Sequence, residues 1–114
     1  MSDCLFCKIR DGEMKANIVH RDEDVIAFED INPQAPTHIL IIPTKHIPTI
    51  DAMEPDDAEV VGKLFLAARK LARDRGHDES GYRVVMNMGR DAGQAVYHIH
   101  LHLLGGRPLS WPPG

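Results

Sequence analysis

The sequence lacks long hydrophobic runs and has few features of a secreted or membrane protein. Its longest aliphatic run, residues 39–42, is far shorter than the roughly 20 residues of a membrane span, so no membrane partner is expected. The first residues show no basic segment followed by an apolar stretch, which argues against a secretory signal peptide. The chain is therefore expected to be soluble and cytoplasmic.

Cysteine is scarce, and basic residues are not in excess. The two cysteines, Cys4 and Cys7, are separated by only two residues, too close for an ordinary fold-closing disulfide. They indicate reduced thiols, a metal-binding pair or a redox pair. The formal net charge is -4, whereas tight nucleic-acid binding depends on clustered lysine and arginine. No nucleic-acid partner is therefore expected, and any anionic ligand should be small.

What the chain does contain is an ordinary globular composition. Its 114 residues are 43% hydrophobic and 26% charged, which predicts one folded domain over residues 1–114. Apolar residues at helical spacing, with acidic residues near the start and basic residues near the end, predict one main helix over residues 55–75. Apolar segments bounded by turn residues predict strands over residues 17–21, 25–30, 38–42, 82–88 and 97–104. These elements predict an α+β domain on a mostly antiparallel sheet.

A histidine stands at every second position of the segment His98-Ile99-His100-Leu101-His102. Side chains alternate along a strand, so the imidazoles should be presented on one face while the aliphatic residues pack on the other. The outer histidines would lie about 13 Å apart, which makes one metal ion bound by all three awkward. Imidazoles act as nucleophiles when neutral and as acids when protonated. Phosphorus chemistry uses both forms, because one ring can attack phosphorus while its neighbour protonates a departing amine.

This segment also carries a family resemblance. Residues 97–104 resemble the histidine triad signature, His-x-His-x-His followed by two apolar residues. The likeness extends to residues 30–38, 87, 93–94, 105–107 and 111–114. The chain is thereby similar to the histidine triad (HIT) superfamily, and within it to the bacterial type of the Hint branch, whose members hydrolyse purine nucleoside phosphoramidates. The resemblance implies a HIT-like fold, with a five-stranded sheet, one main helix and a short N-terminal helix.

The resemblance assigns catalytic roles to four histidines of this sequence. His100 would attack the α-phosphorus and carry a transient nucleotidyl group. His102 would contact the phosphate and help to protonate the leaving amine. His98 would orient the nucleophile through its backbone carbonyl, and His38 would complete the site. No catalytic cofactor is implied.

It also implies a phosphate-binding loop. Asn87 and the backbone N–H groups of Gly93, Gln94 and Ala95 would hold the phosphate oxygens. Ala95 departs from the pattern, because many relatives carry serine at this position. A hydroxyl contact to the scissile linkage is therefore missing, which affects the expected rate and leaving-group preference.

The nucleoside and the C-terminal tail complete the implied binding site. Asp30 would accept hydrogen bonds from the ribose, while Phe28 and Ile31 would flank a purine base. The proline-rich tail carries Trp111, the only tryptophan, and it either docks on another surface or forms a loose end. The resemblance implies a homodimer in which Trp111 reaches the partner's site.

By its spacing, the cysteine pair is half of a zinc site. In bacterial members of the family a similar pair binds zinc together with two histidines, which match His46 and His98 here. The resemblance therefore implies a structural zinc bound by Cys4, Cys7, His46 and His98. Two buried thiols or a redox pair are the alternatives.

Three functions stay open from the residues. The first is a hydrolase of adenosine or guanosine 5'-phosphoramidates that forms a nucleotidyl-His100 intermediate. The second is a regulatory module that binds a purine nucleotide and turns it over only incidentally. The third is a zinc hydrolase with triad histidines as ligands. The sequence has neither the P-loop of many kinases and ATPases nor the nucleophile elbow of serine hydrolases.

Overall fold

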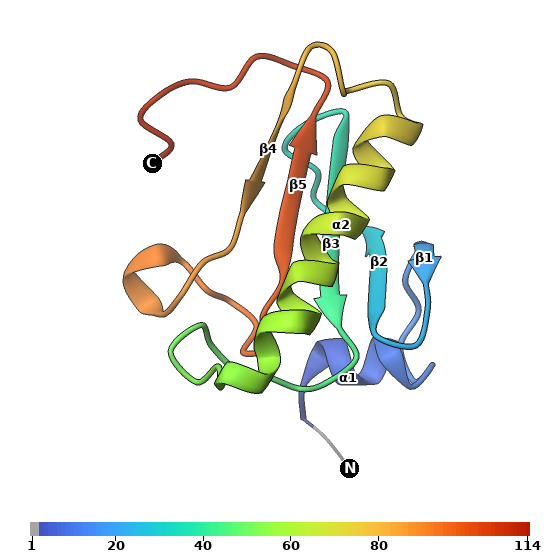
Figure 1. Ribbon diagram of the computed structural model, residues 1–114, viewed down its shortest axis with the longest axis vertical. Coiled ribbons are helices and arrows are strands. Elements are labelled where there is room, and N and C mark those ends of the chain that lie inside the picture. Colours follow the sequence, from blue (N-terminus) through green and yellow to red (C-terminus); the bar gives the residue numbers. More distant parts are fainter. Residues whose placement is uncertain (1–2) are drawn as a thin grey trace.

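The computed structural model describes residues 3–114 and contains an antiparallel sheet with strand order β1-β2-β3-β5-β4 (Figure 1). The strands are β1 (Ile18–Arg21), β2 (Val25–Glu29), β3 (Thr37–Pro43), β4 (Tyr82–Val85) and β5 (Leu101–Gly105). The helices are α1 (Leu5–Arg10) and α2 (Ala58–Asp74), with short 3-10 turns η1 (Pro55–Asp57) and η2 (Arg90–Ala92). The predicted α+β fold with five strands, one main helix and a short N-terminal helix is confirmed.

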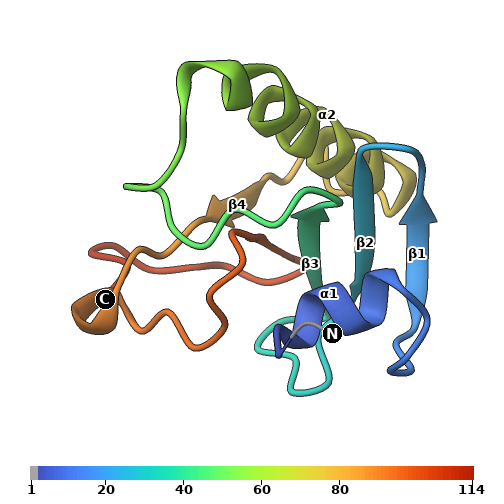
Figure 2. The same cartoon turned by 90° about the horizontal axis from the view of Figure 1, so that it is seen from below.

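The two helices lie on opposite faces of the sheet. Figure 2 shows α2 across one face and α1 against the other. The α2 face holds the larger apolar core, which includes Ile39 and Ile41 of β3 and Leu101 and Leu103 of β5. The central strand β3 is buried along its whole length. Each strand therefore contributes alternate residues to two different environments.

Helix α2 forms where the apolar spacing predicts it. It is preceded by η1, where the Asp57 side chain accepts from the Glu54 N–H at 2.9 Å and Pro55 occupies the first position. Its buried residues are Leu64, Ala67, Ala68, Leu71 and Ala72. The chain leaves the helix at Gly76, whose φ of 79° favours glycine. No helix within residues 3–114 has the length and apolar character to cross a membrane.

Two of the predicted strands are shorter than expected. The segment predicted over residues 82–88 ends as a strand at Val85, and the one predicted over residues 97–104 begins at Leu101. For β5 the reason is tertiary, because the Ile99 N–H donates to the carbonyl of Ile47, beyond the end of β3, instead of joining the ladder. The alternation nevertheless continues through this segment, since Ile99 and Leu101 lie in the larger core while the rings of His98 and His100 pack against Phe6.

Candidate active site

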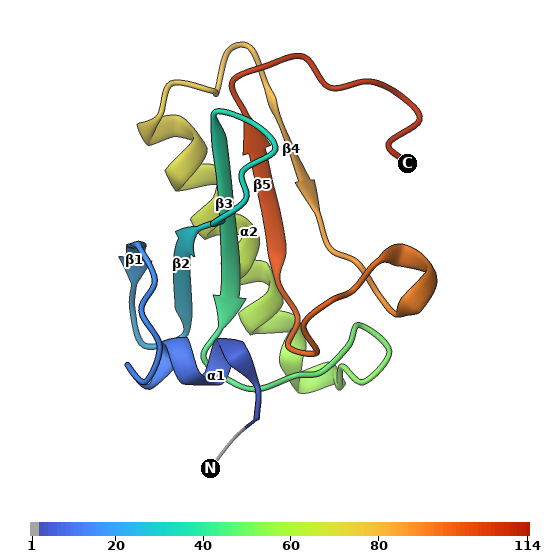
Figure 3. The same ribbon diagram turned by 180° about the vertical axis from the view of Figure 1, so that it is seen from behind.

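Two paired strands bring the predicted catalytic histidines to the α1 face. β3 and β5 are antiparallel, with Leu40 opposite His102, so His102 lies on the same face as His38 and Leu40. Figure 3 looks onto this face. His100 directly precedes β5 in the sequence. The ring centroid of His102 lies 5.2 Å from that of His38 and 5.0 Å from that of His100. The structure therefore places three histidine rings next to one another.

His100 is held with one nitrogen available for attack. Its Nδ1–H donates to the backbone carbonyl of His98 at 2.8 Å. A carbonyl can only accept, so the proton of the neutral ring is on Nδ1 and the lone pair is on Nε2. Burial lowers the pKa of His100, and the hydrogen bond to the carbonyl opposes this only in part. His100 is thus a neutral imidazole near pH 7, with the lone pair of Nε2 free to act as a nucleophile.

In His102 the proton lies on the other ring nitrogen than in His100, and His38 determines this. The backbone N–H of Gln34 donates to Nδ1 of His38 at 3.0 Å, so the neutral His38 ring carries its proton on Nε2. That nitrogen lies 2.9 Å from Nδ1 of His102, which therefore accepts and leaves its own proton on Nε2. Burial, together with the charges of His100 and His38, lowers the pKa of His102 to about 4. His102 is an N–H donor beside a nucleophile.

Asp30 adds a carboxylate to this group. Its Oδ2 lies 3.4 Å from Nε2 of His38, and its Oδ1 accepts from the Asn32 N–H at 2.8 Å. The Asp30, His38 and His102 donor atoms all lie within 4.8 Å of one another. A metal ion would need the lone pair of His38 Nε2, but that nitrogen carries the proton. This arrangement weighs against a zinc hydrolase with triad ligands.

A cleft of about 620 Å³ opens beside these residues. Its lining includes His38, His102 and Asn87, together with Pro113 and Gly114 of the C-terminal tail. The size falls in the range of small-molecule sites. Asn87, which is predicted to bind the phosphate, therefore lines the same cleft as His38 and His102.

The Gln94 side chain stabilises the loop after β4 and is not available to a ligand. The buried Gln94 side chain accepts from the Gly89 N–H at 2.9 Å and donates to the Pro48 carbonyl at 2.8 Å. The backbone N–H of Gly93 donates to Arg90, and that of Gln94 donates to Gly89. These two N–H groups, predicted to hold phosphate, are used within the loop.

The residues predicted to surround the base have very different exposures. Phe28 is buried on β2, and its ring centroid lies 5.4 Å from that of Phe6. Ile31 lies in the loop after β2 and is 100% exposed. Phe6 was missed from the sequence, where its only signal is an aromatic residue between two cysteines. It also lies edge-on to His100, with ring centroids 5.0 Å apart.

Trp111 projects from the tail and is 82% exposed. The tail is held on its own chain by Nη2 of Arg83, which donates to the Ser110 carbonyl at 2.9 Å, and by Nε of Arg107, which donates to the Gln34 carbonyl at 2.9 Å. The large apolar ring is therefore presented outward from a fixed tail.

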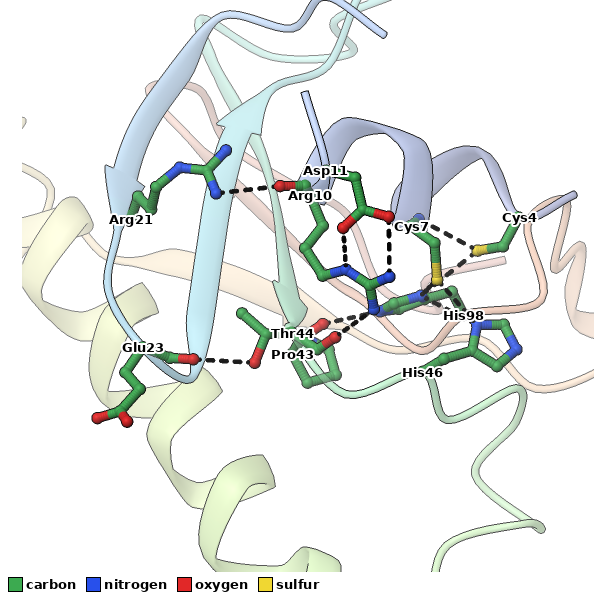
Figure 4. A network of polar contacts seen from close by, with 10 residues as sticks. All are labelled: Cys4, Cys7, Arg10, Asp11, Arg21, Glu23, Pro43, Thr44, His46 and His98. Atoms are coloured by element: carbon green, nitrogen blue, oxygen red, sulfur yellow. Dashed lines mark hydrogen bonds and ion pairs between the residues drawn. The ribbon is translucent and has the colours of Figure 1, made fainter. Parts of the chain in front are cut away.

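A second cluster lies on the other side of His98. Cys4, Cys7, His46 and His98 converge at one end of α1 (Figure 4). His98 Nδ1 lies 3.4 Å from Cys4 Sγ and 3.6 Å from Cys7 Sγ, while His46 Nδ1 lies 3.4 Å from Cys7 Sγ and 3.3 Å from His98 Nδ1. Tetrahedral zinc holds sulfur and nitrogen ligands about 3.3–3.8 Å apart. The four donor atoms fit a zinc ion.

The His98 ring is oriented toward this cluster by the backbone. Its Nε2–H donates to the Pro43 carbonyl at 2.8 Å, so the lone pair on Nδ1 faces the cysteines. Burial lowers the pKa of His98 to about 4, which keeps the ring neutral, as a metal ligand must be. His98 is 0% and His100 only 7% exposed, so the prediction of a presented imidazole face is wrong for these two residues.

Comparison with known proteins places this geometry in a family. A model described as the HIT domain matches residues 11–109. The purine nucleoside phosphoramidase of Escherichia coli K12 is 50% identical over 108 residues, which cover 95% of this chain and 91% of that protein. The chain belongs to the HIT family. The predicted family membership is therefore confirmed.

Other HIT proteins match over nearly the whole chain. A HIT-like protein of Synechocystis is 48% identical over 112 residues, which cover 98% of this chain and 97% of that protein. A HIT family hydrolase from Legionella pneumophila has the same fold, with a TM-score of 0.96, 55% identity and coverage of 98% of this chain and 100% of that one. The chain thus shares the HIT fold with these proteins over nearly its whole length.

The HIT domain match does not include every residue of interest. It covers the triad, His38 and His46, but Cys4, Cys7 and Trp111 lie outside residues 11–109. Inferences about the cysteine cluster and the tail therefore rest on the geometry described above.

Proposed function

We propose that the chain hydrolyses purine nucleoside 5'-phosphoramidates, in which adenosine or guanosine monophosphate is linked to an amine. The observation that carries this proposal is the pair of opposite tautomers, with the lone pair of His100 on Nε2 and the proton of His102 on Nε2. A nucleophile beside a donor suits attack on phosphorus with departure of an amine. The similarity to the E. coli phosphoramidase supports the substrate class.

The reaction has two displacements. Nε2 of His100 attacks the α-phosphorus, and the P–N bond breaks. The anionic phosphate favours a protonated His102, in which Nδ1 also carries a proton and no longer accepts the hydrogen bond from His38, and Nε2 transfers its proton to the departing amine. Water then attacks the phosphorus, neutral His102 takes a proton from it, and the nucleotide leaves Nε2 of His100. Asn87 and the Ala95 N–H bind the phosphate oxygens, Asp30 binds the ribose, and Phe28 and Ile31 contact the base.

The covalent intermediate is the direct test. Protein treated with chelator is mixed with an adenosine phosphoramidate, denatured rapidly and digested for mass spectrometry. Adenylate on the peptide that contains His100 is the expected result. Amine release without any labelled peptide in wild type, together with full turnover by His100→Gln, would contradict the proposal.

A second candidate function is a purine-nucleotide-binding module with incidental turnover. It is favoured by Ala95, which lacks the hydroxyl found in many relatives. Tight binding of a nucleoside monophosphate together with very slow turnover separates it from the first candidate. Restored turnover in Ala95→Ser would identify the missing hydroxyl as the cause.

We further propose that Cys4, Cys7, His46 and His98 bind a structural zinc ion. The fit of their donor atoms to tetrahedral coordination supports this. A bound zinc would cross-link the N-terminal helix to the segments that contain His46 and His98. Elemental analysis should find about one zinc per chain, which is lost in a Cys4→Ser/Cys7→Ser variant.

We also propose a cytoplasmic homodimer. β4 is an edge strand of the sheet, and a second copy could extend the sheet there. Thiols that bind zinc require a reducing compartment. Light scattering at micromolar concentration should give the mass of a dimer, and a monomer would contradict this.

A further inference from the structure

Helix α1 depends on the rest of the molecule for its position. It has only six residues, too few for an isolated helix to be stable in water. Phe6 and Ile9 are buried against the sheet, and Nη1 of Arg10 donates to the Thr44 carbonyl at 2.8 Å (Figure 4). Cys4 caps the helix by accepting from the Cys7 N–H at 3.4 Å. Its N-terminal end is therefore located by the cysteine cluster.

Phe6 connects this helix to the nucleophile. Its ring meets that of His100 edge-on, with centroids 5.0 Å apart and an interplanar angle of 90°. It meets the His98 ring at 5.9 Å and 69°. The Phe6 side chain is 3% exposed, so its position cannot change without moving neighbouring groups. The ring therefore limits rotation of the His100 imidazole.

His98 provides a second connection to the nucleophile. Its ring belongs to the four-residue cluster, while its backbone carbonyl accepts the Nδ1–H of His100 at 2.8 Å. Contacts that fix the His98 ring therefore also fix the His98 carbonyl, which orients His100. Both connections lead from the cysteine cluster to the same imidazole.

We propose that α1 and the cluster at its start form a positioning device for His100, so that metal occupancy determines how the nucleophile is oriented. Phe6 is a positioning residue in this device, and His98 links the two sites. This inference rests on the proposed zinc site. The metal takes no part in the bond changes, and its effect passes through the Phe6 ring and the His98 peptide.

The test compares loaded and ligand-deficient protein. His46→Ala removes an exposed ligand side chain without opening a cavity in the core. His20→Ala is the matched control, because His20 is a histidine outside the cluster. In His46→Ala we expect zinc to be lost and kcat for an adenosine phosphoramidate to fall about tenfold, with little change in KM. Binding of AMP should remain, because the phosphate donors are untouched.

A spectroscopic readout examines His100 directly. Ring nitrogen NMR shifts of zinc-loaded wild type should show His100 with its proton on Nδ1. Chelated wild type and His46→Ala should shift toward a mixture of tautomers, while His20→Ala should not. This readout does not need turnover, so it tests the inference even if the protein proves not to be a phosphoramidase.

A second pair of variants tests the aromatic connection in loaded protein. Phe6→Leu keeps an apolar side chain but removes the aromatic ring that packs against His100. Ile9→Val is the control, because Ile9 lies on the same helix and in the same apolar cluster. We expect Phe6→Leu to lower kcat and shift the His100 nitrogen signals, while Ile9→Val does neither.

The outcomes are separable. Unchanged kcat and unchanged His100 signals in protein that has lost its zinc would overturn the inference and leave both proposed functions standing. A wild-type protein that binds no zinc would overturn the zinc proposal and the inference together. Equal behaviour of Phe6→Leu and Ile9→Val would remove Phe6 from the device.

Discussion

The two faces of the sheet are built from alternate residues of the same strands, yet they differ in character. On the α2 face, Ile39, Ile41, Leu101 and Leu103 are fully buried in an apolar core. On the α1 face, the same strands carry His38 and His102 among apolar side chains. The comparison separates two tasks, because one face stabilises the fold and the other holds the reactive groups.

The α1 face can carry buried imidazoles because every fully buried ring nitrogen there has a hydrogen-bond partner. An unpartnered polar group in the interior costs on the order of 1–3 kcal/mol. Within residues 3–114, no buried side-chain nitrogen or oxygen is left without a hydrogen-bond partner. The same bonds that satisfy the rings also decide which nitrogen is basic. Here stability and reactivity depend on the same contacts.

The largest expected effect comes from removing the nucleophile on the α1 face. His100→Ala should reduce phosphoramidate turnover on the order of 10³-fold or more, because no other group can form the covalent bond. His20→Ala should retain activity. Steady-state kinetics measure both, and urea unfolding should show that His100→Ala stays folded. Turnover within tenfold of wild type would contradict the assignment.

The α2 face should respond in the opposite way. Leu101→Ala should destabilise the fold by about 2–5 kcal/mol, because it leaves a cavity in a closely packed core. Leu66→Ala, at an exposed position on α2, should change stability by less than about 0.5 kcal/mol. Chemical denaturation measures both values. The folded fraction of Leu101→Ala should keep its kcat. A loss of kcat in folded Leu101→Ala would contradict the assignment of stability to one face and reactivity to the other.

Lowering the pH should destabilise the α1 face through His102. Its pKa is about 4 in the folded protein against 6.5 for the free side chain, so the unfolded chain binds more protons between these values. Stability should therefore decrease as the pH falls from 6.5 toward 4, by up to about 2 kcal/mol after solvent screening. Urea unfolding at several pH values tests this. His102→Gln should show a weaker dependence in the same window.

The smallest expected effect concerns the tail. Deletion of residues 109–114 should alter the preference among leaving amines several-fold and leave the fold intact, because the tail lines the cleft but contributes nothing to the core. Kinetics with small and bulky amines, compared with far-UV circular dichroism, measure the two effects. Trp111→Ala shows whether the ring or the backbone of the tail is responsible.

Local periodicity predicted much of the fold. Strands over residues 17–21, 25–30 and 38–42 agree with β1, β2 and β3 to within a residue or two, and the helix over residues 55–75 agrees with η1 and α2. Strand boundaries were predicted less accurately where the backbone hydrogen bonds pass from a neighbouring strand to a loop. Residues 98–100 keep strand-like alternation, but Ile99 bonds to a loop, and no local signal indicates this.

The sequence predicted which residues form the candidate site, but it predicted their spatial arrangement only in part. The alternating histidines and the cysteine pair are visible in the chain, and so is their chemistry. Which imidazoles are buried, which nitrogen of each is protonated and which aromatic ring faces His100 all depend on partners distant in the sequence. Cys4 and His98, for example, are 94 residues apart but 3.4 Å apart in space.

The sequence by itself determined the α+β class, the family and the candidates for the reactive side chains, because periodicity and motif spacing are local properties of the chain. Only the tertiary structure decided that the His98 ring faces Cys4, Cys7 and His46 while its carbonyl holds His100, and that His38 leaves the proton of His102 on Nε2. Tautomers and burial are set by hydrogen bonds and packing between distant segments, which exist only once the chain has folded.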